Sequence, residues 1–171
     1  MRKQHGDYSH YDKRASGSAD TTASPASLWK VVSAIGGDNR YYYLNSLWRL
    51  REVIDGFVGG PGLRHTRRHP SDVRLGDRID SWAVIGVEPE RRLALAFGMR
   101  APGSGVLEFN ITPQHGRTSR LTATAYWDPD GLLGLMYWLS LEPAHLVIFK
   151  GLTREICQRA EALERQNANK A

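Results

Sequence analysis

The sequence has only one cysteine, Cys157, among its 171 residues. No disulfide can therefore form within the chain, and a lone cysteine is typical of proteins in a reducing compartment. The sequence also opens without the pattern of a secretory signal, which is a positively charged start followed by an apolar stretch. We therefore expect a cytoplasmic protein.

An uninterrupted membrane-spanning segment is also lacking. The apolar run GLLGLMYWLSLEPAHLVIF covers residues 131–149, close to the length of about 20 residues that a spanning helix needs. Glu142 nevertheless lies in its second half, where an acid costs roughly 2.5–3.5 kcal/mol to insert, and Pro143 disfavours helical geometry at the residue before it. We predict no membrane span. Instead we predict a short helix or turn, a break, and a second helix that begins at Pro143, with the run buried by a sheet.

Positive charge is in small excess, with a net charge of +5. The excess gathers in the segment RHTRRHPSDVR (64–74), which contains an acid and no tyrosine, tryptophan or phenylalanine for base stacking. We therefore predict no nucleic-acid binding. A basic cluster of this kind also suits a small anionic ligand, and Arg67 is the candidate contact.

Signatures of cofactor and metal sites are missing as well. Gly56, Gly59 and Gly62 have the spacing of a dinucleotide-binding loop, but that loop follows a strand and opens a helix, whereas here a predicted helix precedes it. His65 and His69 are four residues apart without a carboxylate partner beside them. We therefore expect neither a cofactor nor a metal.

The composition, 41% hydrophobic and 24% charged, is that of one folded domain. We expect a partly ordered start and first strand in residues 1–20, the domain in residues 21–166, and a frayed end in residues 167–171.

Two short helices are predicted near the N-terminus. In SPASLWKVVSAIGG (24–37), Ser24 is a candidate N-cap and Pro25 suits the first helical position. In LNSLWRLREVIDGFVGG (44–60), apolar residues share one helical stripe and glycines follow it. Both patterns predict amphipathic helices.

From residue 78 the apolar residues alternate, with turn sequences at 88–91, 101–105, 114–117 and 128–131. This pattern predicts a four-stranded antiparallel meander. One face is apolar and includes Phe97, Met99, Phe109 and Trp127, whereas the other carries polar residues such as Glu108 and is expected to meet water.

The final helical pattern, PAHLVIFKGLTREICQRAEALERQ (143–166), places His145 and Phe149 at the start of an apolar stripe. A long helix with one apolar face fits a sheet whose apolar face has no other cover. The predicted fold class is therefore α+β, with an antiparallel sheet packed on a long C-terminal helix.

Five tryptophans are many for this length, and small-molecule pockets use aromatic walls with a few polar groups. The candidate ligand-binding residues are Trp48, Arg51, Arg67, Trp82, Phe97, Met99, Phe109, Trp127, Tyr137, Trp138, His145 and Phe149. The aromatic rings could instead pack in the core. Arg51 could instead form a surface ion pair with Asp55. His145 and Glu142 are the candidate acid-base groups.

Several strings together resemble the bacterial domain-of-unknown-function family numbered 2867, over about residues 24–163. They are LWRLREVID with GFVGGPGLR, then RRHPSDVRLGDRIDSWAV, APGSGVLEF, and GLLGLMYW with PAHLVIF. Thr66 departs from the family pattern, which usually has glycine there. That family is similar to the SRPBCC, or START-like, superfamily, so the resemblance implies a helix-grip fold in which a curved antiparallel sheet wraps a long C-terminal helix around an internal cavity.

The fold implied by the resemblance does not choose among activities, since the superfamily includes carriers, polyketide cyclases, sensors and hydroxylase subunits. We expect a binding protein for a small apolar or aromatic molecule. Whether that molecule carries an anionic group is left open. The alternatives are a cyclase, dehydratase or hydrolase that uses His145 or Glu142, and an accessory subunit of a separately encoded oxidoreductase. A homodimer or a complex with a partner enzyme is also left open.

Overall fold

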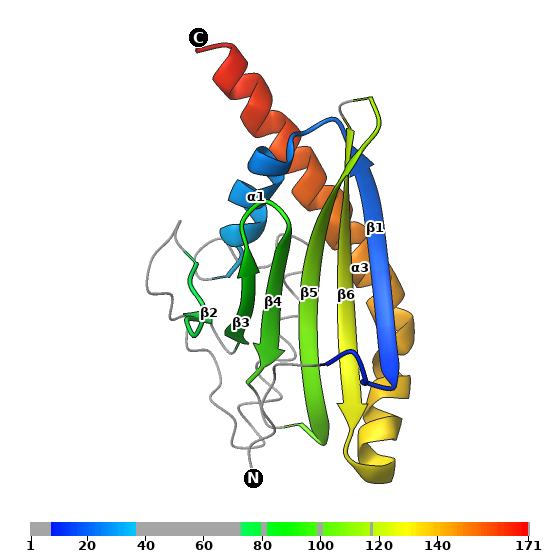
Figure 1. Ribbon diagram of the computed structural model, residues 1–171. Helices are drawn as coiled ribbons and strands as arrows, with labels where there is room; N and C mark the ends of the chain where they lie inside the picture. The colour runs from blue at the N-terminus through cyan, green and yellow to red at the C-terminus, as the bar shows by residue number, and fades with distance from the viewer. Residues whose placement is uncertain (1–7, 37–72, 80–81, 99–100, 117, 171) are drawn as a thin grey trace.

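The computed structural model describes residues 8–36, 73–79, 82–98, 101–116 and 118–170 (Figure 1). Within them a six-stranded antiparallel sheet, in the order β1-β6-β5-β4-β3-β2, packs on a long C-terminal helix. The elements are β1 (Lys13–Thr21), α1 (Pro25–Ser33), β2 (Arg78–Ile79), β3 (Trp82–Glu88), β4 (Arg92–Phe97), β5 (Gly103–Gln114), β6 (Thr118–Pro129) and α3 (Gly131–Ala168).

The first predicted helix is confirmed as α1. The Ser24 side chain accepts a hydrogen bond from the Ser27 backbone N–H at 3.2 Å, and Pro25 occupies the first helical position. Leu28 and Val32 are fully buried. The second predicted helix, over residues 44–60, lies outside the described residues.

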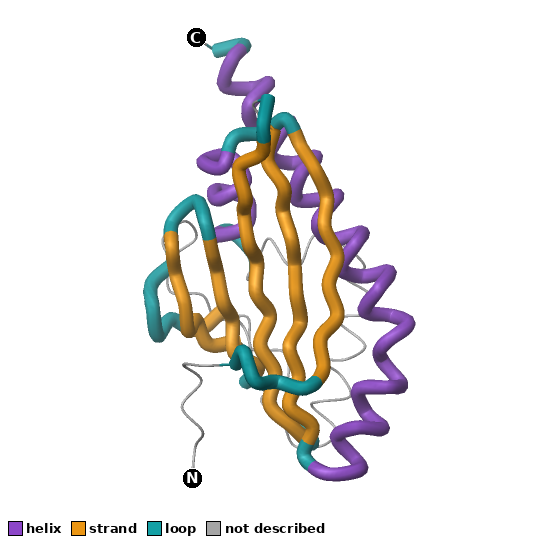
Figure 2. The backbone as a smooth tube through the Cα atoms, turned by 45° about the vertical axis from the view of Figure 1, so that its right-hand side comes forward, coloured by secondary structure: helices purple, strands orange, loops and turns teal. Residues whose placement is uncertain are grey.

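The predicted meander is also confirmed, as strands β3 to β6. The first strand, β1, returns from the start of the chain to pair with β6, from Lys13 opposite Trp127 to Thr21 opposite Ser119. Figure 2 shows α3 running along one side of the long strands. The curved sheet and this helix form the predicted layout, an antiparallel sheet packed on a long C-terminal helix.

The core lies between the apolar face of the sheet and helices α1 and α3. Leu93, Leu95 and Phe109 on the sheet are fully buried, and Leu152 and Ile156 of α3 pack into the same cluster. The alternation of the strands and the helical stripe of the C-terminal segment therefore predicted the buried faces correctly.

α3 crosses β1 at Gly17. A Cβ atom at this position would lie 2.5 Å from the backbone nitrogen of Lys150 and 2.6 Å from the carbonyl carbon of Phe149. Contacts that short do not occur between non-bonded atoms, so only glycine lets the helix backbone come so close to the strand.

The predicted break at Pro143 is wrong, because α3 continues through it as one helix of 38 residues. A proline inside a helix removes one backbone hydrogen-bond donor and crowds the carbonyl four residues earlier. Residues on both sides are held by packing, with Trp138 and Phe149 buried in the same core. The run 131–149 is also not wholly buried, since its outward side chains, such as Leu132 and Leu139, are exposed.

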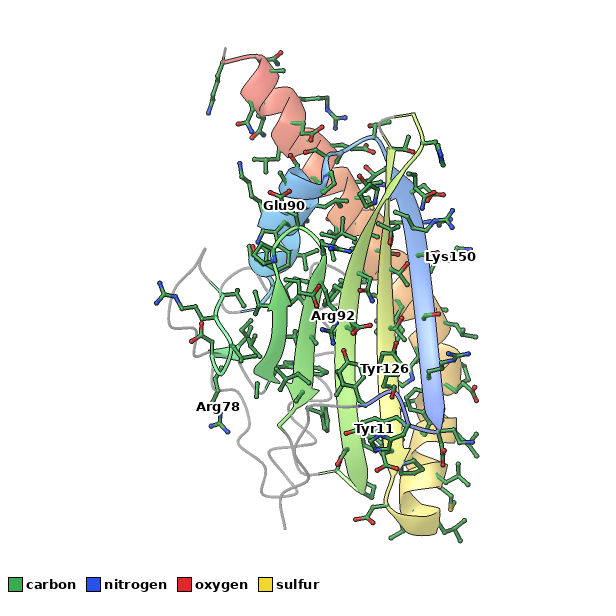
Figure 3. All side chains as sticks on the ribbon, viewed as in Figure 1. Tyr11, Arg78, Glu90, Arg92, Tyr126 and Lys150 are labelled. Atoms are coloured by element: carbon green, nitrogen blue, oxygen red, sulfur yellow. The ribbon has the colours of Figure 1, made fainter. Side chains whose placement is uncertain are left out.

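The outer face of the sheet is covered in part, which corrects the expectation that it meets water. Tyr8 and Tyr11 lie across it and form a small apolar cluster with Ala94, Val106 and Tyr126. Figure 3 shows Tyr11 and Tyr126 on this face, with α3 behind the sheet.

A buried carboxylate, Glu108, holds this N-terminal segment in place. It accepts hydrogen bonds from Tyr8, from Arg92 Nε at 2.8 Å and from Asn110 Nδ2 at 2.7 Å. Arg92 also donates to the Tyr8 hydroxyl at 2.6 Å. The side chain of Glu108 is 9% exposed, so the network replaces the water that a carboxylate would otherwise bind.

This network predicts a loss of stability in acid. Burial raises the pKa of Glu108, but the hydrogen bonds from Tyr8, Arg92 and Asn110 outweigh burial and hold the pKa below the ordinary value of 4.5. A carboxyl group with a lowered pKa stabilises the folded state above that ordinary value, and the contribution disappears as the pH falls through the folded-state pKa. We expect the free energy of unfolding, measured with urea, to decrease as the pH is lowered from neutral to about pH 3.

Glu108→Gln is the control for this pH dependence. The amide cannot ionise, so the variant should be less stable at neutral pH and should lose less stability in acid than the unchanged protein. An identical acid loss in both proteins would assign the effect to other carboxyl groups.

Candidate functional site

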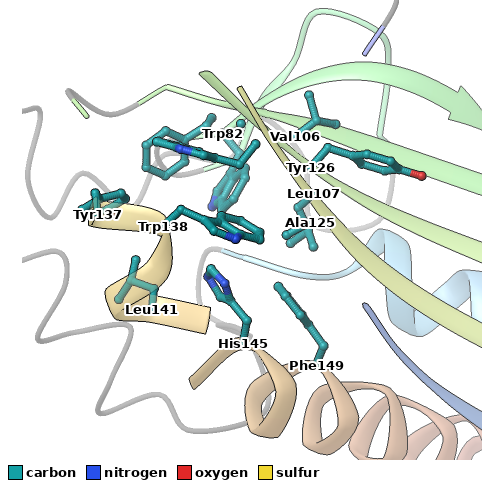
Figure 4. A pocket seen from close by; sticks show the side chains of 13 residues that line it. Trp82, Val106, Leu107, Ala125, Tyr126, Tyr137, Trp138, Leu141, His145 and Phe149 are labelled. Atoms are coloured by element: carbon teal, nitrogen blue, oxygen red, sulfur yellow. The ribbon is translucent and has the colours of Figure 1, made fainter. Parts of the chain in front are cut away.

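A cavity lies between the apolar face of the sheet and the N-terminal half of α3 (Figure 4), and we call it the aromatic cavity. It has a volume of about 40 Å³. Its lining comprises Trp82, Phe97, Gly105, Val106, Leu107, Ala125, Tyr126, Trp127, Tyr137, Trp138, Leu141, His145 and Phe149.

Aromatic rings from three strands build the sheet side of the cavity. Trp82 on β3 and Phe97 on β4 are opposite each other in the register, with ring centroids 5.4 Å apart. Phe97 contacts Trp127 of β6 at 6.0 Å, edge to face. A Cβ atom on Gly105 of β5 would lie 3.0 Å from the Trp127 ring, so the absence of a side chain at this position makes room for the indole.

Three turns of α3 build the opposite side. Trp138, Leu141, His145 and Phe149 follow one another at spacings of three, four and four residues, which places them on one helix face. The His145 ring lies 4.8 Å from Trp138 and is stacked on Phe149 at 5.5 Å. Trp138 is stacked with Trp127 across the cavity at 6.5 Å.

The described lining contains no Asp, Glu, Lys or Arg. Its polar side-chain groups are the His145 imidazole, the Tyr137 hydroxyl and the Trp127 indole N–H, which donates to the Gly134 carbonyl at 3.3 Å. The Tyr126 hydroxyl donates to Glu108 at 3.4 Å on the other face of the sheet. A lining of this kind suits an uncharged molecule, because a charge placed there has no opposite charge among the described lining residues.

The structure brings seven of the predicted site residues together around the cavity: Trp82, Phe97, Trp127, Tyr137, Trp138, His145 and Phe149. Phe109 is fully buried in the core and is not part of the lining. Glu142 is exposed and also lies outside the lining. Trp48, Arg51, Arg67 and Met99 are outside the described residues.

Six lining residues were not among the predicted site residues: Gly105, Val106, Leu107, Ala125, Tyr126 and Leu141. For Gly105 and Leu141 the sequence nevertheless carried a signal. Gly105 was assigned to a turn, but it shares the alternation of Leu107 and Phe109 and therefore their face of β5. Leu141 was missed because the predicted break at Pro143 interrupted the helical spacing from Trp138 to His145. Among the described residues, no group of three or more His, Cys, Asp or Glu side chains could hold a metal ion, and the absence of a metal stays a prediction.

Comparisons with known proteins identify the family and the fold. The model of the family described as "Protein of unknown function (DUF2867)" matches residues 5–152. The search of curated proteins found no match.

Solved structures with the same fold include the Zhui aromatase/cyclase from Streptomyces sp. R1128, at 12% identity and a TM-score of 0.53, covering 87% of this chain and 93% of that one. The protein of unknown function SA2116 from Staphylococcus aureus has 12% identity and a TM-score of 0.53, with 90% and 97% covered. DynU16, from the dynemicin biosynthetic locus, has 15% identity and a TM-score of 0.52 over 88% of this chain. This chain spans about half of DynU16, 48% of its length.

Proposed function

Because this chain belongs to the DUF2867 family and shares the fold of an aromatase/cyclase, we propose that it binds a small apolar or aromatic molecule in the aromatic cavity. The observation that carries the proposal is the lining itself. Rings from β3, β4, β6 and α3 converge on one space, and no formally charged residue is among the described lining.

The rings supply the binding energy that such a ligand needs. A planar guest gains contact with both the sheet wall and the helix wall, and edge-to-face or offset contacts with aromatic side chains add about 0.5–1.5 kcal/mol per pair beyond burial. The imidazole of His145 and the hydroxyl of Tyr137 are polar groups that can orient a single hydroxyl or carbonyl of the guest.

The volume sets a condition on how the ligand enters. A cavity of about 40 Å³ corresponds to a few water molecules, since one buried water needs on the order of 10–15 Å³. A ring-sized ligand therefore requires side chains to turn aside. Phe97, Tyr137, Leu141 and His145 are only half-buried, so they are the side chains that can move without breaking the core.

A matched pair of ligands tests the proposal. Trp82, Trp127 and Trp138 line the cavity, so a bound ring should change the intrinsic fluorescence of the protein. We expect 2-naphthol to bind at least about tenfold more tightly than 2-naphthoate, because the carboxylate would lose its hydration without gaining an opposite charge from the described lining. Equal or tighter binding of the anion would contradict an uncharged ligand.

Leu141→Trp locates the site. The larger ring fills the cavity from a half-buried position, so binding of 2-naphthol should be abolished while the circular dichroism spectrum is retained. Ser140→Trp is the matched control, because Ser140 is exposed one position earlier on the same helix and should leave binding unchanged. Binding that survives in Leu141→Trp would move the ligand elsewhere.

A second candidate function, acid-base catalysis, is favoured by the position of His145 in the cavity wall. Its test is turnover of a ligand identified by the binding assay. His145→Phe keeps a ring beside Trp138 and Phe149, so a protein that only binds should retain its affinity. Product formation that disappears in this variant while binding persists would establish the enzyme instead.

A further inference from the structure

The N-terminal half of α3 has an apolar face that points away from the sheet. Across the most apolar 18-residue window of this helix, only 22% is buried within the described part of the chain. The outward side chains and their exposed fractions are Leu132 72%, Leu133 73%, Met136 59%, Leu139 53%, Leu146 58% and Val147 57%. An exposed apolar area of this extent marks an interaction surface rather than ordinary solvent-exposed helix.

The spacing of this face matches that of a coiled-coil seam. Leu132, Met136, Leu139, Pro143 and Leu146 follow one another in steps of four, three, four and three residues, and Lys150 continues the series. Apolar residues that repeat every 3.5 residues on average are arranged to pack against another helix. The opposite face of the same segment is already occupied by the aromatic cavity.

We propose that two copies of this chain form a dimer by packing these seams against each other, with the two α3 helices antiparallel. In the register that aligns the two series, Met136 packs on the partner's Leu146, and Leu139 packs on the partner's Pro143. The segment from Leu132 to Lys150 makes a seam of about 27 Å at 1.5 Å per residue.

Charge favours the antiparallel direction. In that register, Lys150 lies beside the partner's Leu132, next to the acidic start of the partner helix, where Asp128 and Asp130 precede Gly131 in the sequence. A parallel pair would instead bring Lys150 beside the same lysine of the partner. The antiparallel pair also places the opposite ends of the helix dipoles together.

A lipid surface fits the same face less well. Helices that lie on a membrane carry Lys and Arg on their polar face, whereas the other face of this segment packs on the sheet and the segment 131–149 has no Lys or Arg at all. Exposed Glu142 and the preceding aspartates would be repelled by anionic lipids.

Stable interfaces bury roughly 800 Å² per partner, and a single short helix pair is below or near this value, so the dimer should dissociate on dilution.

Sedimentation velocity over a range of concentrations tests the dimer. The unchanged full-length chain should shift from monomer to dimer as its concentration rises. The double variant Leu139→Glu, Leu146→Glu should stay monomeric and folded, because both side chains are exposed in the monomer. Leu75→Glu is the matched control: Leu75 is 71% exposed but lies outside the seam, so dimerisation should persist.

Cysteine pairs test the direction of the helices. In Met136→Cys, Leu146→Cys, the two new thiols of one chain are about 15 Å apart along the helix, too far for a disulfide within the chain. Mild oxidation should therefore yield a covalent dimer of this double variant. Met136→Cys alone should yield none, since an antiparallel pair keeps the two copies of this residue apart. The native Cys157 is buried and does not compete.

Three outcomes would overturn the proposal. A chain that stays monomeric at every concentration removes the dimer. A covalent dimer of Met136→Cys alone would establish a parallel pair. A monomer that floats with vesicles of phosphatidylcholine and phosphatidylserine, and loses this binding in the double glutamate variant, would assign the face to lipid.

Discussion

Gly17→Ala is expected to lower the free energy of unfolding by about 3 kcal/mol, near the upper end of the usual cost of overpacking. The added Cβ atom would overlap the backbone of α3 at Phe149 and Lys150, and a backbone cannot rotate aside as a flexible side chain can. The helix must therefore shift away from β1. For a chain of this size the midpoint of thermal unfolding should fall by roughly 6–12 °C. Urea unfolding and calorimetry measure both quantities.

Ser18→Ala is the control for Gly17→Ala, because Ser18 is the next residue of β1 and is exposed. Its free energy of unfolding should change by less than about 0.5 kcal/mol. A loss below about 1 kcal/mol in Gly17→Ala would show that the helix adjusts easily, and that the close approach to β1 is not a requirement of the fold.

Trp127→Ala is expected to cost about 3–5 kcal/mol of unfolding free energy and to change which ligands bind. Trp127 is 4% exposed and contacts Phe97, Tyr137 and Trp138, so its removal leaves a void that joins the aromatic cavity. The enlarged cavity should accept a three-ring phenol that the unchanged protein excludes. Fluorescence titration with 2-naphthol and its three-ring analogue measures this change in selectivity.

Trp29→Ala separates the two effects of Trp127→Ala. Trp29 is a half-buried residue of α1, outside the cavity lining, so its removal should lower stability less and leave ligand selectivity unchanged. If both variants altered selectivity equally, the change would follow from general loosening of the protein and would not report the shape of the cavity.

Local signals in the sequence predicted much of the fold. Ser24 and Pro25 predicted the start of α1, because an N-cap residue followed by proline is a local signal. The alternation of apolar residues placed Phe97 and Trp127 on the same face of the sheet. These signals depend on neighbours in the chain, so they can be read without knowledge of the tertiary structure. The aromatic wall followed from them, and most of its described members were predicted.

Errors arose where distant contacts decide the structure. Pro143 disfavours a helix locally, but packing of Trp138 and Phe149 on either side holds α3 together. Glu108 falls on the polar side of an alternating strand, and no local pattern shows that Tyr8, which is 100 residues away in the chain, covers it. Leu141 was missed because a break was predicted at Pro143. The cover on the outer face of the sheet was missed because it depends on the distant Tyr8.

The pairing of β1 with β6 has a consequence for synthesis of the protein on the ribosome. β1 is made early, yet its hydrogen-bonding edge has no partner until β6 has emerged from the exit tunnel. At about 5–20 residues per second this delay is on the order of 5–20 s. The sequence of β1, KRASGSADT, is charged and rich in small polar residues, so the waiting nascent strand is a poor template for aggregation.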